Sequence, residues 1–272
     1  MDRLRSVSRT SPVAVLREIW SRKSFLGFFA WSKTKASLSE SRTSLLWWII
    51  EPSLKILVYG AIFGLILPAS TRPENFVVSL IIGVAIFETY STQSGASTRF
   101  FAQSDVIEES TSISPWSLMM STVIETYLKS AALIVIVFGA ALLLGVSPRL
   151  SWLAFPLLFA GYGVFLYSMG LIVAALSRFF PTFPRLLGAL NRVVFYGSGI
   201  FWSIERVLAS YPTLLSIAEL NPVYQIIQLG RAAVMGNGID WGHVIALHSL
   251  VTVVLFAVGG LLFHHANKSD HA

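Results

Sequence analysis

Six long apolar stretches dominate the pattern of hydrophobic and polar positions along the chain. Each is near the ~20 residues that a helix needs to cross about 30 Å of hydrocarbon at 1.5 Å per residue. Residues typical of turns separate several of them, at 68–73, 147–148 and 181–184. The pattern predicts an all-α, polytopic membrane protein with six transmembrane helices, at residues 45–67, 75–95, 116–146, 151–176, 186–204 and 241–264.

A shorter amphipathic segment precedes these stretches. Pro12 is typical of a first helical residue, and apolar and charged side chains then separate onto two sides of a helix. This helix is too short to span and is expected to lie at the membrane interface. The polar run 32–44 is expected to lift the chain off the surface. We therefore divide the chain into an N-terminal cytoplasmic tail with its interfacial helix, 1–44, and a six-span transmembrane domain, 45–272. The apolar side of the helix holds Val15, Leu16, Ile19 and Trp20.

The segment 205–240 departs from this pattern. Its two apolar pieces, 207–220 and 223–235, are too short to span and favour a re-entrant or interfacial helical hairpin between the fifth and sixth spans. Asn221 followed by Pro222 predicts the start of its second helix. A hairpin directly before the last span could close an exit pathway or could serve only to pack the bundle, and the sequence leaves both interpretations open.

Composition and charge agree with a membrane protein and set its orientation. The chain is 54% apolar and 12% charged, with a mean hydropathy of +0.69, whereas soluble domains carry about 25% charged residues. If both termini are cytoplasmic, thirteen Lys and Arg residues lie in inside segments and four in outside segments. Because positive charge favours the cytoplasmic side, we expect both termini in the cytoplasm.

Two ion pairs are predicted inside the spans. Glu51 and Lys55 in the first span, and Glu125 and Lys129 in the third, are each four residues apart on one helix face. Such pairs can neutralise themselves, which is a complete structural explanation, although charges inside spans also mark substrate or ion pathways. Pro52 removes a backbone hydrogen bond and is expected to kink the first span.

Several kinds of chemistry have no motif in this sequence. It contains no G-x-x-x-x-G-K-[ST] loop for ATP phosphates, no H-E-x-x-H zinc motif and no cysteine. The basic residues flank the spans, so nucleic acid is not an expected partner. We expect no catalytic residue, no metal and no cofactor on this chain. Active transport would then need energy from a partner protein or an ion gradient.

Short motifs in a fixed order resemble the permease subunits of type-2 ABC exporters for polysaccharides, a group that includes O-antigen, capsule, teichoic-acid and galactan exporters. The interfacial helix, the six spans and the missing ATPase domain fit the same family, and the resemblance covers about 13–263. The residues that carry it are Leu46, Trp47, Glu51 and Pro52, then Ile62, Phe63 and Gly64, then Ser198, Gly199, Ile200 and Phe201, and finally Leu220, Asn221, Pro222, Val223, Tyr224 and Arg231.

The resemblance implies a homodimer in the bacterial inner membrane that binds two copies of a separate ABC ATP-binding subunit, which holds ATP and Mg. It implies export of a lipid-linked polysaccharide from the cytoplasmic side, in contact with membrane lipid. The pathway would run between the protomers, past aromatic side chains on which sugar rings slide and past the charged entrance of the first span. The pathway residues would be Trp47, Trp48, Glu51, Lys55, Tyr59, Phe63, Phe87 and Tyr90.

The resemblance also implies a coupling site and a gate. A groove between the interfacial helix, 13–22, and the first cytoplasmic loop, 99–115, would receive the ATPase. Relatives often carry basic residues in this loop, but here its balance is acidic, so we expect a basic groove on the partner. The coupling residues would be Arg17, Arg22, Arg99, Asp105, Glu108 and Glu109. The gate hairpin would comprise Tyr211, Asn221, Pro222, Tyr224 and Arg231.

Three other interpretations were weighed. A type-2 permease for a drug or a small lipid fits the same architecture, and the high aromatic content and the interfacial helix argue against it. An ion-coupled carrier would favour internal repeats and broken helices near the midplane, which are not evident. A membrane enzyme would need clustered polar residues at one face, and the dense polar loop 99–114 has no acid–base or metal constellation.

Overall fold

The structure, a computed structural model, describes residues 12–39, 44–111 and 113–268, which fold into helices, turns and irregular segments without a strand. Five helical segments in this part of the chain are long and apolar enough to cross a membrane. They confirm the predicted spans 45–67, 75–95, 116–146, 151–176 and 241–264 to within a few residues. The five are α3 (Ser44–Ile66), α4 (Phe76–Ser97), α6 (Pro115–Leu143), α7 (Ala154–Phe179) with the preceding turn η3 (Leu150–Leu153), and α12 (Trp241–Lys268).

The predicted fifth span, 186–204, is not one long helix. In its place α8 (Phe183–Gly197) is 15 residues long, about 22 Å at 1.5 Å per residue. The chain then turns at Gly199, whose φ of +61° suits glycine because it has no Cβ. The run of apolar residues predicted a longer helix than the structure contains. Hydrophobicity indicates that a segment avoids water, but it does not determine the backbone dihedral angles at which a helix ends.

The N-terminal region contains two helices where one was predicted. Helix α1 (Pro12–Ser21) begins at Pro12 as expected, while Ser11 lies outside the described residues. Helix α2 (Lys23–Ser39) continues through most of the polar run 32–44, which was expected to lift the chain off the membrane surface. Leu26, Ala30 and Thr34 recur every four residues and are all buried, and α2 packs along α6. The small side chains of Ala30 and Thr34 allow this largely polar part of α2 to approach α6 closely.

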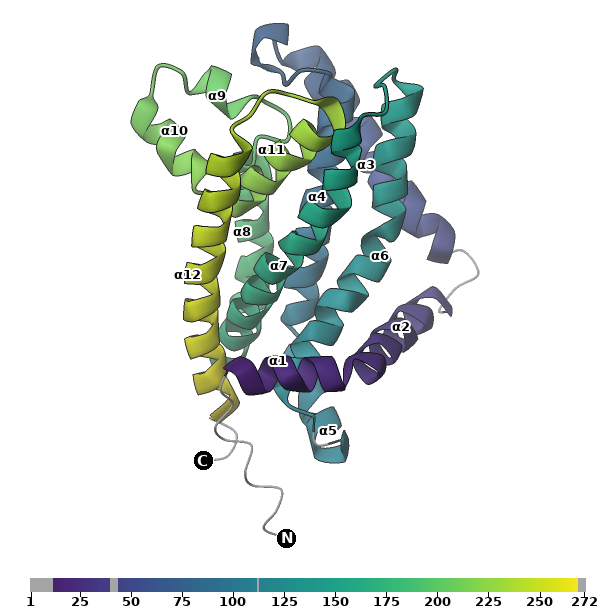
Figure 1. Cartoon of the computed structure of the whole chain (residues 1–272), viewed down its shortest axis with the longest axis vertical. Helices are drawn as coiled ribbons and strands as arrows, with labels where there is room; N and C mark the ends of the chain where they lie inside the picture. Colours follow the sequence, from purple (N-terminus) through teal and green to yellow (C-terminus); the bar gives the residue numbers. More distant parts are fainter. Residues whose placement is uncertain (1–11, 40–43, 112, 269–272) are drawn as a thin grey trace.

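The two ends of the bundle carry different elements, as Figure 1 shows. Helices α1 and α2 lie across the lower end, where the short helix α5 (Phe100–Thr111) and the last turns of α12 also lie. The hairpin lies at the opposite end and consists of α9 (Ile204–Val207), α10 (Pro212–Glu219) and α11 (Pro222–Met235). Helix α11 packs against α4, α7 and α12, whereas α10 has no buried residue. The hairpin therefore has one inner and one outer helix.

Helices α7 and α12 form the most extensive helix pair, and a glycine sets their closest approach. A Cβ added at Gly259 would lie 2.9 Å from the backbone oxygen of Ser168 and 3.0 Å from Ile172 Cγ1. A backbone oxygen cannot rotate away as a flexible side chain can. Gly259 is therefore required by packing, in the way that small residues bring transmembrane helices together.

Gly259→Ala is expected to destabilise the protein by roughly 1–3 kcal/mol, because the new methyl group overpacks the α7–α12 contact. Gly260→Ala is the matched control, since its Cβ would meet only the Trp116 ring at 3.7 Å. Without a clash, alanine in a helix stabilises by roughly 0.5–1 kcal/mol relative to glycine. Thermal unfolding of the purified variants should give shifts of opposite sign. Two shifts of the same sign would contradict the packing assignment.

Candidate functional site

A polar cavity of about 210 Å³ opens between α3, α4 and α6. Trp47 lies at it and is 56% exposed, and most of α3 presents apolar side chains to the outside of the bundle. The cavity therefore places polar side chains next to the apolar outer surface of α3. An amphiphilic molecule requires both kinds of contact, because it has a polar part and an apolar part. The cavity is lined by, among others, Trp47, Glu51, Lys55, Glu88, Lys129 and Ser130.

Lys55 joins two helices at this cavity. Its Nζ lies 3.0 Å from Glu51 on its own helix, which confirms the predicted local pair, and 3.0 Å from Glu88 on α4. The sequence analysis missed Glu88. A signal for it existed, because Glu88 is a carboxylate inside a predicted span with no base one turn away, and such a group needs a partner from another helix.

Glu125 is the centre of a second network. Its carboxylate lies 2.7 Å from Lys129, the predicted partner, and 3.2 Å from Lys33 of α2. Lys33 also donates to Gln103 of α5 at 3.0 Å. A chain of polar contacts therefore runs from α5 through α2 to a carboxylate inside α6, and Lys129 brings it to the cavity wall. The sequence did not indicate these contacts, because Lys33 lies in the polar run 32–44, which was expected to leave the membrane surface.

The aromatic residues predicted to line the pathway pack mainly inside the protomer. Phe87 and Tyr90 are 7% and 4% exposed, while Tyr59 and Phe63 are partly buried against the core. Phe195 and Phe201, which are not among the predicted pathway residues, join them, with ring centroids 4.6 Å apart for Phe87–Phe195 and 4.1 Å for Phe63–Phe201. Sugar contact by these residues stays a prediction, and the side chain of Trp48 lies outside the described residues.

The predicted coupling residues lie at the end of the bundle that carries α1. Arg17, Arg22 and Arg99 are exposed, so they are available to a partner. Asp105 instead forms an ion pair with Arg178 at the end of α7, at 3.5 Å. The side chains of Glu108 and Glu109 lie outside the described residues, and their role stays a prediction.

Helix α1 is hydrogen-bonded to the loop that was predicted to be the first cytoplasmic one. The Glu18 carboxylate accepts a hydrogen bond from the Ser114 backbone N–H at 3.0 Å and another from the Ser114 hydroxyl. Val15 is buried and Ile19 packs against the core, while Leu16 and Trp20 are exposed. The predicted apolar side of α1 is thus divided between the bundle and the surroundings, and two hydrogen bonds join α1 to this loop.

The hairpin begins its inner helix as predicted. Asn221 accepts hydrogen bonds from the backbone N–H groups of Val223 at 3.0 Å and Tyr224 at 3.4 Å, with Pro222 at the first helical position. Gly236 ends α11 at a φ of +76°. Tyr211, at the start of α10, is exposed. The predicted gate residues therefore lie both on the surface and in the interior.

Arg231 fastens the hairpin to the bundle. Its Nη2 donates to the carbonyl oxygens of Gly199 at 2.9 Å, Ile200 at 3.1 Å and Ser79 at 3.4 Å, and Nη1 donates to Gln228 at 3.4 Å. Burial lowers the pKa of Arg231 to about 10, so the guanidinium remains charged at neutral pH. One side chain therefore satisfies carbonyls in the turn after α8 and links them to α4.

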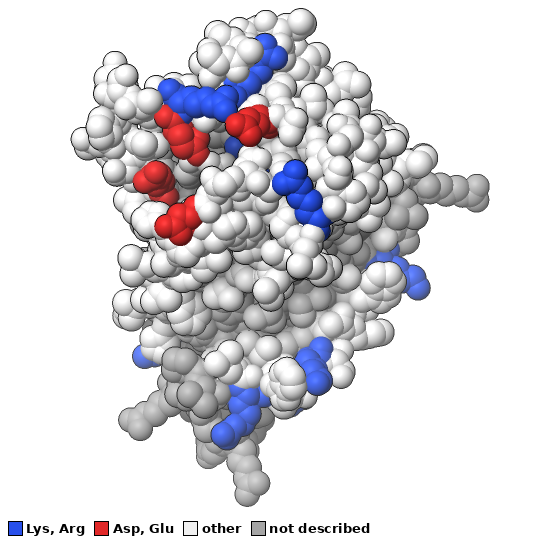
Figure 2. All heavy atoms as spheres, turned by 45° about the horizontal axis from the view of Figure 1, so that its top comes forward, with Lys and Arg blue, Asp and Glu red and all other residues white. Residues whose placement is uncertain are grey.

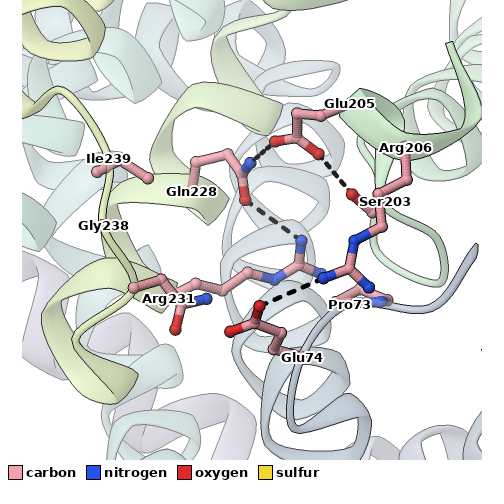
Figure 3. Close-up of a pocket in the computed structure, with 10 residues that line it drawn as sticks. Pro73, Glu74, Ser203, Glu205, Arg206, Gln228, Arg231, Gly238 and Ile239 are labelled. Atoms are coloured by element: carbon pink, nitrogen blue, oxygen red, sulfur yellow. Dashed lines mark hydrogen bonds and ion pairs between the residues drawn. The ribbon is translucent and has the colours of Figure 1, made fainter. Parts of the chain in front are cut away.

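Glu205 organises the outer part of the same region (Figure 3). It accepts hydrogen bonds from Ser203 at 2.8 Å, from Tyr224 and from Gln228. Burial, with the Glu205 charge, raises the pKa of Tyr224 above its ordinary value, so the phenol keeps its proton and donates it. Arg206 pairs with Glu74 at 3.3 Å. All of these residues except Tyr224 line an outer pocket of about 280 Å³.

On the face that Figure 2 shows, acidic side chains lie toward one end of the bundle only. In Figure 2 the Asp and Glu side chains in view lie over the hairpin end, mixed with Lys and Arg, and nearer the other end the charged side chains in view are Lys and Arg. This distribution agrees with the bias in the sequence that predicted the orientation.

Long apolar helices, buried ion pairs, interfacial helices at one end and a helical hairpin at the other define a multi-pass membrane permease. The model of the ABC-2 type transporter family matches residues 28–235, most of the chain, and the chain therefore belongs to this family. Its membrane permeases contain no ATPase site, carry no cofactor on the membrane subunit, and work with a separate ATP-binding subunit.

Two bacterial permeases show similarity over most of their length. The chain is 22% identical over 235 residues to the O-antigen export system permease protein RfbA of Klebsiella pneumoniae, covering 85% of this chain and 87% of that protein. It is 23% identical over 223 residues to the polysialic acid transport protein KpsM of Escherichia coli, covering 82% and 85%. Both are distant relatives of this multi-pass membrane protein.

Proposed function

We propose that this chain is the transmembrane subunit of an ATP-driven exporter that moves a lipid-linked polysaccharide from the cytoplasmic side across the bacterial inner membrane. The observation that carries the proposal is the similarity to the O-antigen and polysialic acid permeases, which extends over more than four fifths of each chain. The exporter would contain two copies of this chain and two of the ATP-binding subunit. The lateral cavity beside α3 offers polar contacts next to an apolar surface, which suits a lipid-linked glycan.

We further propose six crossings, with both termini in the cytoplasm. Figure 1 supports this topology, because α1 and the C-terminal end of α12 lie at the same end of the bundle and an even number of crossings is needed to return there. Helix α8 and the turn 198–203 would then form the short fifth crossing. A bent, irregular segment is tolerated in a membrane where its carbonyls are satisfied by protein groups, as Arg231 does here.

ATP hydrolysis by the purified complex of this chain and its ATP-binding subunit tests the proposal. Addition of lipid-linked glycan is expected to stimulate hydrolysis, because substrate binding and ATP turnover are coupled in an exporter. Stimulation by a drug or a simple phospholipid but not by the glycan would favour the alternative type-2 permease. If no ATPase co-purifies with the chain, the proposed assembly is wrong.

Trp47→Ala is expected to reduce glycan stimulation several-fold while changing stability by no more than about 0.5 kcal/mol, because Trp47 is exposed beside the cavity. Phe87→Ala, at a buried ring, is expected to cost roughly 3–5 kcal/mol in stability instead. Hydrolysis rates and thermal unfolding of both variants make the comparison. Full stimulation in Trp47→Ala would remove this residue from the pathway.

A further inference from the structure

The outer pocket contains a buried donor that lacks an acceptor. Arg231 is 4% exposed and lines the pocket, and its Nε has no hydrogen-bond partner among the described residues. A buried N–H without an acceptor costs roughly 1–3 kcal/mol, and this nitrogen has almost no accessible surface, so a ligand reaches it only after a small shift of the side chains around it. Figure 3 shows Arg231 and Gln228 between the α9 residues on one side and Gly238 and Ile239 on the other.

The charges around this donor cancel. Arg206 is paired with Glu74, and Glu205 is connected to Arg231 through Gln228. Two guanidinium groups and two carboxylates leave no net positive charge to attract an anion. The pocket offers N–H donors and carboxylate acceptors in fixed positions, an arrangement that matches hydroxyl groups, because each hydroxyl both donates and accepts.

The size and the lining of the pocket restrict the ligand further. Its volume of about 280 Å³ lies at the lower end of the roughly 300–1,000 Å³ typical of small-molecule sites. Its lining includes no aromatic ring, so a sugar would be held by its hydroxyl edge and not by stacking on its face. Asn237 also lines the pocket and adds an amide that can donate and accept.

We propose that the outer pocket between α9, α11 and the 236–240 segment is an exit-side subsite that binds one neutral sugar unit of the glycan through its hydroxyl groups. This inference rests on the proposed export function and adds a location and a binding chemistry to it. Arg206 and Asn237 donate to the sugar, Glu74 accepts from it, and a small shift of the neighbouring side chains lets the Arg231 Nε donate as well. The subsite would hold the glycan beside the hairpin while the next unit advances.

Two substitutions block the subsite without disturbing its network. Gly238→Phe places a ring at the wall of the pocket, where a Cβ meets no atom within 4 Å. Asn237→Leu removes the amide but keeps a similar size. Gly161→Phe is the matched control, because Gly161 is exposed on α7, outside the pocket lining, and also has open space around a Cβ.

The test uses the purified complex with its ATP-binding subunit in lipid nanodiscs. Saturation-transfer NMR with galactose, mannose, glucose and N-acetylglucosamine is expected to show binding by at least one sugar, reduced at least fivefold in Gly238→Phe and Asn237→Leu and unchanged in Gly161→Phe. Inorganic phosphate should not compete. Signals that do not depend on the two variants, no signal with any of the four sugars, or displacement by phosphate would each overturn the subsite.

Glycan export in cells separates this inference from the function on which it rests. Gly238→Phe is expected to lower the export rate several-fold at normal amounts of the complex, with Gly161→Phe at the wild-type rate. Export by the wild type together with an unaffected Gly238→Phe variant would refute the subsite alone. Absence of glycan export by the wild type would refute the proposed function.

Discussion

Replacing Glu125 with glutamine is expected to destabilise the protein by about 3 kcal/mol, because it leaves two lysines without their carboxylate. The Glu125 side chain is 10% exposed and pairs with Lys129 and Lys33 at 2.7 and 3.2 Å. Removal of one member of a buried ion pair typically costs roughly 3–5 kcal/mol, since the remaining charge stays desolvated. Both lysines are about one third exposed, which places the expected value at the lower end.

Glu51→Gln is the control for this prediction. Glu51 is also a carboxylate one turn from a lysine, but its side chain is 65% exposed and Lys55 retains Glu88 after the change. We expect a loss of no more than about 0.5 kcal/mol. Thermal unfolding in detergent and the amount of folded protein in the membrane measure both variants. Equal losses would show that the α2–α6 network does not stabilise the fold.

The Glu125 network also bears on coupling. Lys33 connects Gln103 of α5 with Glu125, and α5 lies at the end of the bundle where we propose that the ATP-binding subunit docks. Loss of the network should therefore loosen the interfacial helices from the spans. This explains why a residue inside the bundle is expected to affect the stability of the end that carries α1, α2 and α5.

Arg231→Met is expected to destabilise the protein on the order of 3 kcal/mol and to release the hairpin. The carbonyl oxygens of Gly199 and Ile200 would lose their donor, while that of Ser79 lies within α4 and loses an additional bond. Each buried polar group left unpaired costs roughly 1–3 kcal/mol. The methionine side chain fills part of the space, so the expected loss of stability is smaller than the sum of the costs of the separate carbonyl groups. Hydrogen exchange is expected to rise in 198–207, because this segment has no helix of more than four residues to hold it.

Two variants control the Arg231 prediction. Arg231→Lys keeps the charge but offers one nitrogen in place of a planar fork, so it should restore only part of the stability. Arg206→Met removes a partly exposed guanidinium from the same region, and an exposed pair of this kind contributes no more than about 1 kcal/mol. Protection of 198–207 at the wild-type level in Arg231→Met would show that other contacts hold the hairpin.

Local patterns in the sequence determined the membrane class and most of the helices. Apolar runs of span length must form helices, because lipid offers no hydrogen bonds to the backbone. Asn221 and Pro222 start α11, and Gly236 ends it, through contacts within a few residues. The pairs formed by Glu51 with Lys55 and by Glu125 with Lys129 follow from the helical repeat alone. The lengths of the spans and these local contacts were therefore predictable.

Contacts between distant segments were decided only by the tertiary structure. Glu88 reaches Lys55, and Lys33 reaches Glu125, because of how α2, α3, α4 and α6 pack, which no periodicity encodes. The same holds for α8: the apolar run 186–204 predicted a full span, but the chain turns at Gly199 because Arg231, 32 residues away, supplies the donors that a continued helix would otherwise supply. Contacts between residues a few positions apart determine a helix, whereas this turn depends on a contact with Arg231, which is distant in the sequence and close in the structure.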